Sequence, residues 1–184
     1  MTKIEKLLEA IILGCKENDR QSQKELYGNF YSYAMSICLR YTGGEADAVE
    51  VLNDGFLKVF KNIEKFDIQK PFKPWLRRIL VNACIDHIKK NAKHNHLADI
   101  SEAQVEETSQ VAPDHNMDYK EILAKIGQLS PAYRAVFNLY VIEGYKHQEI
   151  AEQLGITTST SKANLTRAKA ALRSLLSKGV YQYG

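Results

Sequence analysis

Residues 147–178 read HQEIAEQLGITTSTSKANLTRAKAALRSLLSK and predict two helices joined by a tight turn. Gly155 stands where a helix C-terminus favours a left-handed residue. Thr157 or Thr158 can then cap a second helix by accepting a hydrogen bond from a free backbone N–H of its first turn. The apolar residues of the first helix recur at helical spacing and share one face: Ile150, Ala151 and Leu154. The stretch is therefore a predicted helix-turn-helix.

The second helix of this pair has an apolar side and a basic side. Its predicted buried stripe is Leu165, Ala168, Leu172 and Leu175. Near its N-terminal end, where recognition helices meet base edges, the outward residues are Ser159, Lys162, Ala163, Thr166 and Arg167. No acidic residue follows Glu152, so the cations of this helix are uncompensated and suit phosphates. The alternative is an amphipathic helical hairpin that only completes a core.

Charge is distributed unevenly along the 184 residues, which are 45% hydrophobic and 26% charged, as in soluble globular proteins. Residues 1–96 contain 16 Lys or Arg and 12 Asp or Glu, and residues 119–184 contain 9 Lys or Arg and 4 Asp or Glu. Residues 97–118 contain no Lys or Arg and 6 Asp or Glu. Although the net charge is only +3, two basic regions therefore flank an acidic connector.

Cysteine usage and hydropathy predict a reduced cytoplasmic protein. Cys15, Cys38 and Cys84 are odd in number and form no metal-like pair. The N-terminus lacks a basic region followed by an apolar run and a cleavage site, and no stretch reaches the roughly 18 apolar residues of a membrane span. We therefore expect a cytoplasmic location and no membrane contact.

Hydrophobic periodicity predicts an all-α protein. The N-terminal helices are expected from Ile4 to the break at Asn18-Asp19 and over about 21–41, 45–60 and 74–91. The C-terminal helices are expected over about 117–128, 131–143 and 147–154 and from the cap at Thr157 or Thr158 to about 178. Ser130 is a predicted cap before Pro131. Gly55 costs its helix about 1 kcal/mol relative to alanine, which a close helix crossing would explain. Two helical domains, 1–93 and 118–184, are thus joined by a flexible acidic linker, 94–117.

A second candidate nucleic-acid surface lies in the first domain, where a short loop over 62–75 leads into a basic helix. Aromatic residues there alternate with cations, as single-stranded nucleic acid requires, because bases stack on rings while Lys and Arg follow the backbone. The alternative is that Phe66, Phe72 and Trp75 belong to the core. The candidate DNA-binding residues are Lys70, Phe72, Lys73, Trp75, Arg77, Arg78, Asn82, Lys89 and Lys90.

Three stretches together resemble a known family. Residues 48–60, AVEVLNDGFLKVF, are similar to its polymerase-clamp helix, and residues 72–86, FKPWLRRILVNACID, to its promoter-melting helix, with Trp75, Arg78 and Asn82 in the family's positions. Residues 129–137, 143–145 and 149–151 are similar to its upstream-element domain, although Ser161 stands where the family usually has valine. In this order the motifs resemble extracytoplasmic-function (ECF) sigma factors, which direct bacterial RNA polymerase to promoters.

The resemblance implies how each part works. The first domain would bind the polymerase clamp and trap an unstacked base of the minus-ten element, and the last helix would enter the major groove of the minus-thirty-five element. The linker would pass through the polymerase, where its carboxylates suit a basic channel; a solvated tether is the alternative. The implied partners are core RNA polymerase, promoter DNA and an anti-sigma protein, with no cofactor, metal or enzymatic activity. The implied polymerase-binding residues are Glu50, Leu52, Asn53, Asp54 and Phe56.

Two other classes of protein remain open. A stand-alone helix-turn-helix repressor with a helical dimerisation half would bind a palindromic duplex without polymerase. A zinc enzyme is the weaker alternative, because its candidate ligands lack paired-cysteine spacing. Those ligands are Cys84, His87, His94 and His96.

Overall fold

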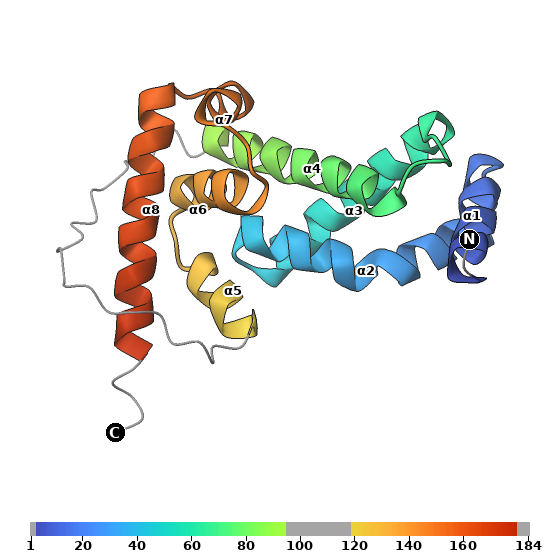
Figure 1. Cartoon of the computed structure of the whole chain (residues 1–184), viewed down its shortest axis with the longest axis horizontal. Helices are drawn as coiled ribbons and strands as arrows, with labels where there is room; N and C mark the ends of the chain where they lie inside the picture. Colours follow the sequence, from blue (N-terminus) through green and yellow to red (C-terminus); the bar gives the residue numbers. More distant parts are fainter. Residues whose placement is uncertain (1–2, 95–118, 180–184) are drawn as a thin grey trace. The chain divides into compact units, whose positions relative to one another are not determined.

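The computed structural model describes residues 3–94 and 119–179, and every regular element in these ranges is helical (Figure 1). The all-α prediction is therefore confirmed for the described residues. They form two compact units: residues 3–38 with residues 45–84, and Leu39–Gly44 with residues 85–94 and 119–179. Residues 95–117 of the predicted linker lie outside the described residues.

The N-terminal helices follow the predicted order. They are α1 (Lys3–Lys16), α2 (Arg20–Thr42), α3 (Glu45–Asn62), a 3-10 turn η1 (Ile63–Lys65) and α4 (Phe72–His94). The predicted loop over 62–75 is shorter than expected, because η1 and the first residues of α4 occupy both of its ends. The Lys16 ammonium of α1 donates a 2.8 Å hydrogen bond to the Phe66 carbonyl after η1, which fixes α1 to this loop.

The core of the first unit forms where the apolar faces of α2, α3 and α4 meet. Its fully buried side chains include Leu26, Ile37, Leu52, Val59, Leu76 and Leu80. A Cβ built on Gly55 of α3 would lie 2.6 Å from Cδ2 of Leu80 on α4. The predicted close helix crossing is therefore present at this glycine. Val81 and Ile85 are buried together with Leu76 and Leu80, so α4 is covered over a wide part of its circumference.

The C-terminal helices gather on α8. They are α5 (Tyr119–Gly127), α6 (Pro131–Phe137), a π-helical turn η2 (Asn138–Ile142), α7 (His147–Leu154) and α8 (Thr158–Gly179). The first two helices and α7 pack against α8, which is the longest of the group (Figure 1). The Ser130 hydroxyl caps α6 as predicted, accepting a 3.5 Å bond from the Tyr133 N–H.

The predicted helix over 131–143 changes its winding near its middle. The Glu143 N–H donates to the Asn138 carbonyl at 3.0 Å, which is the i→i+5 spacing of a π-helix. Asn138 is buried, and its side-chain amide donates to the Arg134 carbonyl at 2.9 Å. A buried amide must find such partners, which periodicity does not reveal.

Within the second unit, which includes Leu39–Gly44, the buried Arg134 forms hydrogen bonds with the C-terminal ends of α2 and α5. Arg134 donates to the carbonyls of Tyr41, Thr42 and Gly127 at 2.8, 2.8 and 2.7 Å. The last carbonyls of a helix have no partner within that helix, and a planar guanidinium can satisfy several of them at once. Arg134 is therefore a structural cation and not a candidate for phosphate binding.

The three cysteines lie in the interior of the protein. Cys15, Cys38 and Cys84 are all buried, and none forms a disulfide. Burial, followed by the Asp19 charge, raises the pKa of the Cys15 thiol to about 11, so this thiol stays protonated. Among the described helices, none is long and apolar enough to cross a membrane.

Candidate nucleic-acid interface

The turn between α7 and α8 has the geometry that the sequence predicts. Gly155 adopts the left-handed conformation, with φ 69°, and the Ile156 N–H donates back to the Ala151 carbonyl at 3.0 Å. Thr157 caps α8, because its hydroxyl oxygen accepts from the Thr160 N–H at 3.0 Å. The predicted helix-turn-helix is thus confirmed, with Thr157 and not Thr158 as the cap.

The inward face of α8 is only partly the predicted stripe. Leu165 and Ala168 are buried, whereas Leu172 and Leu175 are half-buried. The same face buries two polar residues that the sequence did not place, Ser161 and Asn164. Ser161 is 0% exposed and lies in the first turns, next to the residues expected to meet DNA.

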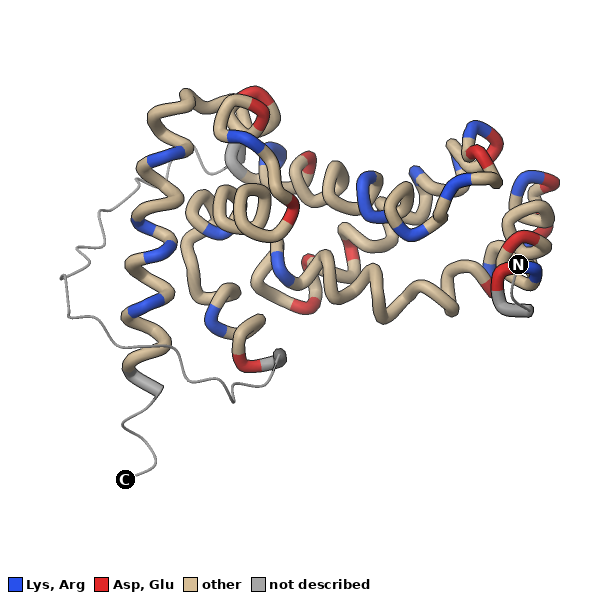
Figure 2. The backbone as a smooth tube through the Cα atoms, in the orientation of Figure 1, with Lys and Arg blue, Asp and Glu red and all other residues tan. Residues whose placement is uncertain are grey.

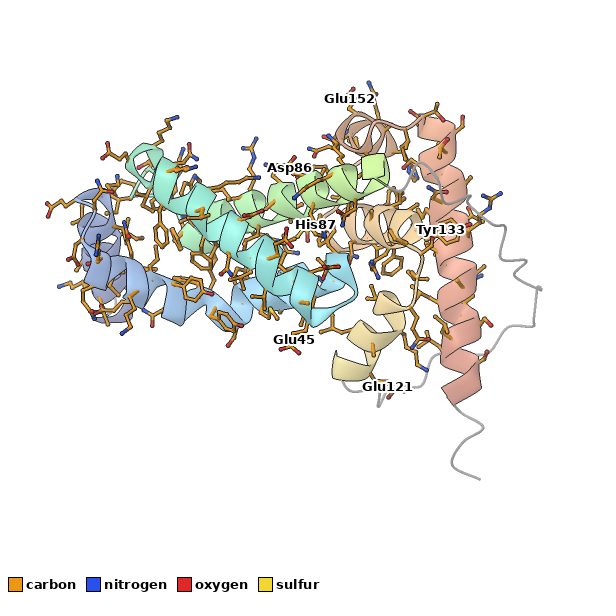
Figure 3. The ribbon with its side chains drawn as sticks, turned by 180° about the vertical axis from the view of Figure 1, so that it is seen from behind. Glu45, Asp86, His87, Glu121, Tyr133 and Glu152 are labelled. Carbon is orange, nitrogen blue, oxygen red and sulfur yellow. The ribbon has the colours of Figure 1, made fainter. Side chains whose placement is uncertain are left out.

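The outward face of α8 carries all the predicted residues. Ser159, Lys162, Ala163, Thr166 and Arg167 are each exposed. At 3.6 residues per turn the small uncharged ones form the centre of this face, with Lys162, Lys169 and Arg173 along one flank and Arg167 on the other. Figure 2 shows no acidic residue along α8, and Figure 3 places Glu152, the last acidic residue, on α7.

The aromatic residues before and in α4 are arranged differently from the prediction. Phe72 is 3% exposed, and its ring centroid lies 5.0 Å from that of Phe30 and 5.4 Å from that of Phe66. Apolar rings gain more by packing together than by facing water. Phe72 is therefore not available to stack on a base, and the alternative that it belongs to the core is correct for Phe66 and Phe72.

Other residues of the α4 candidate surface stay accessible. Arg78 and Asn82 are exposed and share one face of α4 with the half-buried Trp75, whereas the half-buried Arg77 lies on another side of the helix. Lys90 is exposed and Lys89 half-buried further along the helix.

Two exposed lysines stand before and at the start of α4. Lys70 pairs with Asp67 at 3.6 Å in an exposed salt bridge, which contributes little stability. The Lys73 ammonium lies 5.8 Å from the ring centroid of Tyr33 on α2, which is a half-buried aromatic residue. No sequence signal distinguishes Tyr33 from its buried neighbours.

The predicted polymerase-binding residues separate into an exposed and a buried set. Glu50, Asn53 and Asp54 are exposed on α3, whose first turn carries Glu45 (Figure 3). Leu52 and Phe56 are 0% and 2% exposed, so neither can contact a partner, because both face the core.

Leu57, which is not among the predicted polymerase-binding residues, exposes an apolar side chain on α3. It is 57% exposed on the same side of α3 as the exposed polar set, Glu50, Asn53 and Asp54. The sequence does contain a signal for its exposure, because Leu57 is out of phase with the apolar stripe that includes Phe56 and Val59. A single exposed leucine is common on protein surfaces, so its place beside the three polar residues, and not its exposure alone, makes Leu57 a candidate contact.

A hydrogen bond between α2 and α3 fixes one polar member of this surface. The Tyr27 hydroxyl donates to the Asn53 side-chain oxygen at 3.0 Å. Burial, followed by the neighbouring Tyr31, raises the pKa of Tyr27, so the hydroxyl keeps the proton that it donates. The orientation of Asn53 is therefore set by its neighbour.

The described residues gather no group of three or more possible metal ligands. Cys84 is buried, and the His87 ring nitrogen Nε2 is 2.9 Å from the Asn91 amide. His96, the last candidate ligand of the zinc alternative, lies outside the described residues.

Comparison with known proteins identifies the class. The family "Sigma-70 region 2" matches residues 26–94, and "Sigma-70, region 4" matches residues 119–172. The chain is 31% identical to the RNA polymerase sigma factor NccH of Alcaligenes xylosoxydans over 72% of this chain and 74% of that protein. It is 28% identical to the ECF RNA polymerase sigma factor SigW of Bacillus subtilis over 94% and 98% of the two chains.

Among solved structures, the sigma factor RpoE from Bartonella quintana, in a complex with the anti-sigma factor NepR, has a TM-score of 0.49 at 19% identity. That alignment covers 84% of this chain and 96% of the other, and at this score it adds nothing to the assignment.

The fold and the two matches define a sigma-70 class protein in which region 2 precedes region 4. The chain belongs to the ECF RNA polymerase sigma factors. It directs RNA polymerase to promoters in transcription initiation, and the alternative of a stand-alone repressor is not favoured.

Proposed function

We propose that the two parts of the chain divide promoter recognition between them. Residues 1–93 bind core polymerase and the melted minus-ten element, and residues 118–184 bind the minus-thirty-five duplex. The family matches at 26–94 and 119–172 support this division. The linker, 94–117, connects the two.

The outward face of α8 carries the proposal for the upstream element. An α-helix fits the major groove, where its centre meets base edges and its flanks approach the phosphates of the two strands. On α8 the centre is small and uncharged, while cations stand on both flanks. We assign Thr166, at the centre, to base reading, with Ser159 and Ala163 giving the close approach. Lys162 stands on a flank but in the first turns of α8, where recognition helices meet base edges, so we assign it to base reading as well, and Arg167 to a phosphate.

On α4, the proposed contact to the melted strand shifts from Phe72 to the exposed face of Trp75, Arg78 and Asn82. Trp75 still offers part of a ring for stacking, Arg78 a cation for the backbone, and Asn82 an amide that can pair with a base edge. Cations elsewhere on α4 and in the segment before it add electrostatic attraction: Lys70, Lys73, Arg77, Lys89 and Lys90.

For polymerase binding, we propose the exposed side of α3. Glu50 and Asp54 supply charge, Asn53 a preoriented amide, and Leu57 the apolar anchor in place of Leu52 and Phe56. A central apolar anchor within a polar rim is the usual arrangement of energetically important interface residues.

Some expectations rest on the family alone. An anti-sigma partner, a cytoplasmic location, action by binding and not by catalysis, and a route of the acidic linker through the polymerase remain predictions.

Transcription from a promoter library tests the α8 assignment. Reconstituted holoenzyme would transcribe templates randomised across the upstream element, starting from a promoter found by sequencing transcript 5′ ends on genomic DNA. Lys162→Ala and Thr166→Ala should change which bases are tolerated, since one good base contact is worth about 1–3 kcal/mol. Arg167→Ala should weaken all sequences alike and lower the salt slope by roughly one unit. Base preferences identical to wild type in both reading variants would refute the assignment.

Affinity for core polymerase tests the α3 assignment. Asp54→Arg and Leu57→Asp should each weaken binding, whereas Leu7→Asp on α1, which is also an exposed leucine at 61%, should not. Equal affinity for all three variants would remove α3 from the interface.

A further inference from the structure

At the start of the helix-turn-helix, the His147 side chain contacts residues of two other elements of the second unit. His147, the first residue of α7, places its ring nitrogen Nδ1 2.9 Å from the Ser161 hydroxyl on α8. The face of the His147 ring stacks on the Tyr140 ring of η2, with centroids 4.4 Å apart and an interplanar angle of 22°. The imidazole is thus held between η2, α7 and α8.

The contact reaches α8 at the place where helix position matters for DNA reading. Ser161 lies in the same two turns as Ser159, Lys162 and Thr166, but it points inward and is 0% exposed. Moving this turn relative to α7 would therefore move the outward residues by the same amount. Reading groups must be held within about 0.5 Å and 10–20° to work.

A polar contact defines this position more closely than an apolar one. A hydrogen bond requires both a short distance and an alignment of donor and acceptor, whereas apolar contact is non-directional. A buried hydroxyl without a partner is also costly, so Ser161 has a strong preference for the arrangement that satisfies it.

The protonation state of the ring is compatible with this bond. Burial, followed by the charges of Lys162 and Lys169, lowers the pKa of His147, which favours the neutral imidazole. A neutral imidazole has one donor and one acceptor nitrogen, and a hydroxyl can complement either. The Tyr140 ring covers its face from η2.

We propose that His147 is a positioning residue for promoter recognition, which fixes the first turns of α8 through Ser161 and thereby sets discrimination at the minus-thirty-five element. This inference rests on the proposed function of α8. His147 need not touch DNA, because it acts through the orientation of Lys162 and Thr166.

Variants of both partners separate this role from general stabilisation. His147→Asn keeps a polar atom near the place of Nδ1, whereas His147→Gln places its amide near Nε2 and loses the bond. Ser161→Ala removes the other partner, and the double variant His147→Gln with Ser161→Ala completes a cycle. Full-length variants would be assayed with core polymerase on the promoter library, and discrimination measured as the ratio of transcription from preferred and non-preferred upstream elements.

We expect His147→Gln and Ser161→Ala each to reduce discrimination roughly tenfold, the scale of one base contact. The double variant should lose no more than either single one, and His147→Asn should retain most of the discrimination. A merely structural role would lower transcription from all elements equally and leave the ratio unchanged, which would overturn the proposal. Additive losses in the double variant would overturn it too.

The variant Lys162→Ala tells whether a negative result refutes only the positioning role of His147 or the assignment of α8 to DNA reading. If Lys162→Ala alters base preference while the His147 and Ser161 variants do not, α8 reads DNA and only the positioning role is wrong. If the Lys162 variant also keeps the wild-type preferences, the assignment of α8 itself is wrong.

Discussion

The sequence predicts nucleic-acid surfaces at the start of α4 and at the start of α8, but the two differ in which of the predicted side chains are exposed. On α8 the small and cationic residues expected to face outward are all exposed. At α4 the cations are largely accessible, but Phe72 and the preceding Phe66 are buried in a ring cluster. A cation without a buried partner stays at the surface, because burying it unpaired is costly, whereas an aromatic residue beside a cation can face either way.

The largest effect is expected from Phe72→Ala. Removing a fully packed ring should destabilise the first unit by about 3–5 kcal/mol, since it leaves a cavity next to Phe30 and Phe66. Urea unfolding measures this loss, and Ser159→Ala on the exposed face of α8 should stay within about 0.5 kcal/mol of wild type. If Phe72→Ala instead keeps normal stability but fails to melt promoters, Phe72 acts on DNA and not in the core.

A smaller effect is expected from Asn82→Ala on the exposed face of α4. Loss of a hydrogen bond to a base edge should reduce open-complex formation by about 1–3 kcal/mol and leave closed-complex formation nearly unchanged. Permanganate footprints of the melted region report the difference. Lys65→Ala, which removes an exposed cation on η1, is the control. Footprints of wild-type intensity in the Asn82 variant would leave α4 with only an electrostatic role.

Two glycine substitutions test how tightly the unit that buries the rings is packed. In Gly55→Ala the new methyl group meets Leu80, so we expect a net loss of about 1 kcal/mol despite the better helix propensity of alanine. In Gly28→Ala on α2 a Cβ meets nothing within 4 Å, so the same change should stabilise the chain by up to about 1 kcal/mol. Thermal unfolding of the two variants should give shifts of opposite sign. Equal shifts would mean that the α3–α4 crossing relaxes freely.

The smallest effect concerns pH and the second unit. The pKa of His147 is lowered by burial and by Lys162 and Lys169, so the unfolded chain takes up a proton before the folded chain does. The stability that depends on neutral His147 is complete above the ordinary histidine pKa of about 6.5 and declines as the pH falls below it. Unfolding free energies of wild type and His147→Gln, which lacks the bond to Ser161, should therefore converge at acidic pH. A constant difference across the titration would show that His147 does not contribute through its protonation state.

Much of the fold was readable from sequence because its signals are local. Helical periodicity, Gly155 and the caps Ser130 and Thr157 act over one or two turns, and the helices begin and end close to the predicted residues. The exposed residues of α8 were predicted for the same reason, since a strongly basic helix side has few ways to become buried.

Only the tertiary structure decided which residues fill the space between helices. Phe72, Leu52 and Phe56 point into the core and Leu57 outward, because the crossing of α3 and α4 determines which side of each helix is covered. Arg134 and Asn138 are buried because carbonyls distant in sequence become their partners. The pairing of His147 with Ser161 joins residues 14 positions apart on two helices, and periodicity treats each helix separately. The sequence by itself determined the helices and the distribution of charge, whereas packing and buried hydrogen bonds, which depend on three-dimensional neighbours, determined which candidate residues can act at a surface.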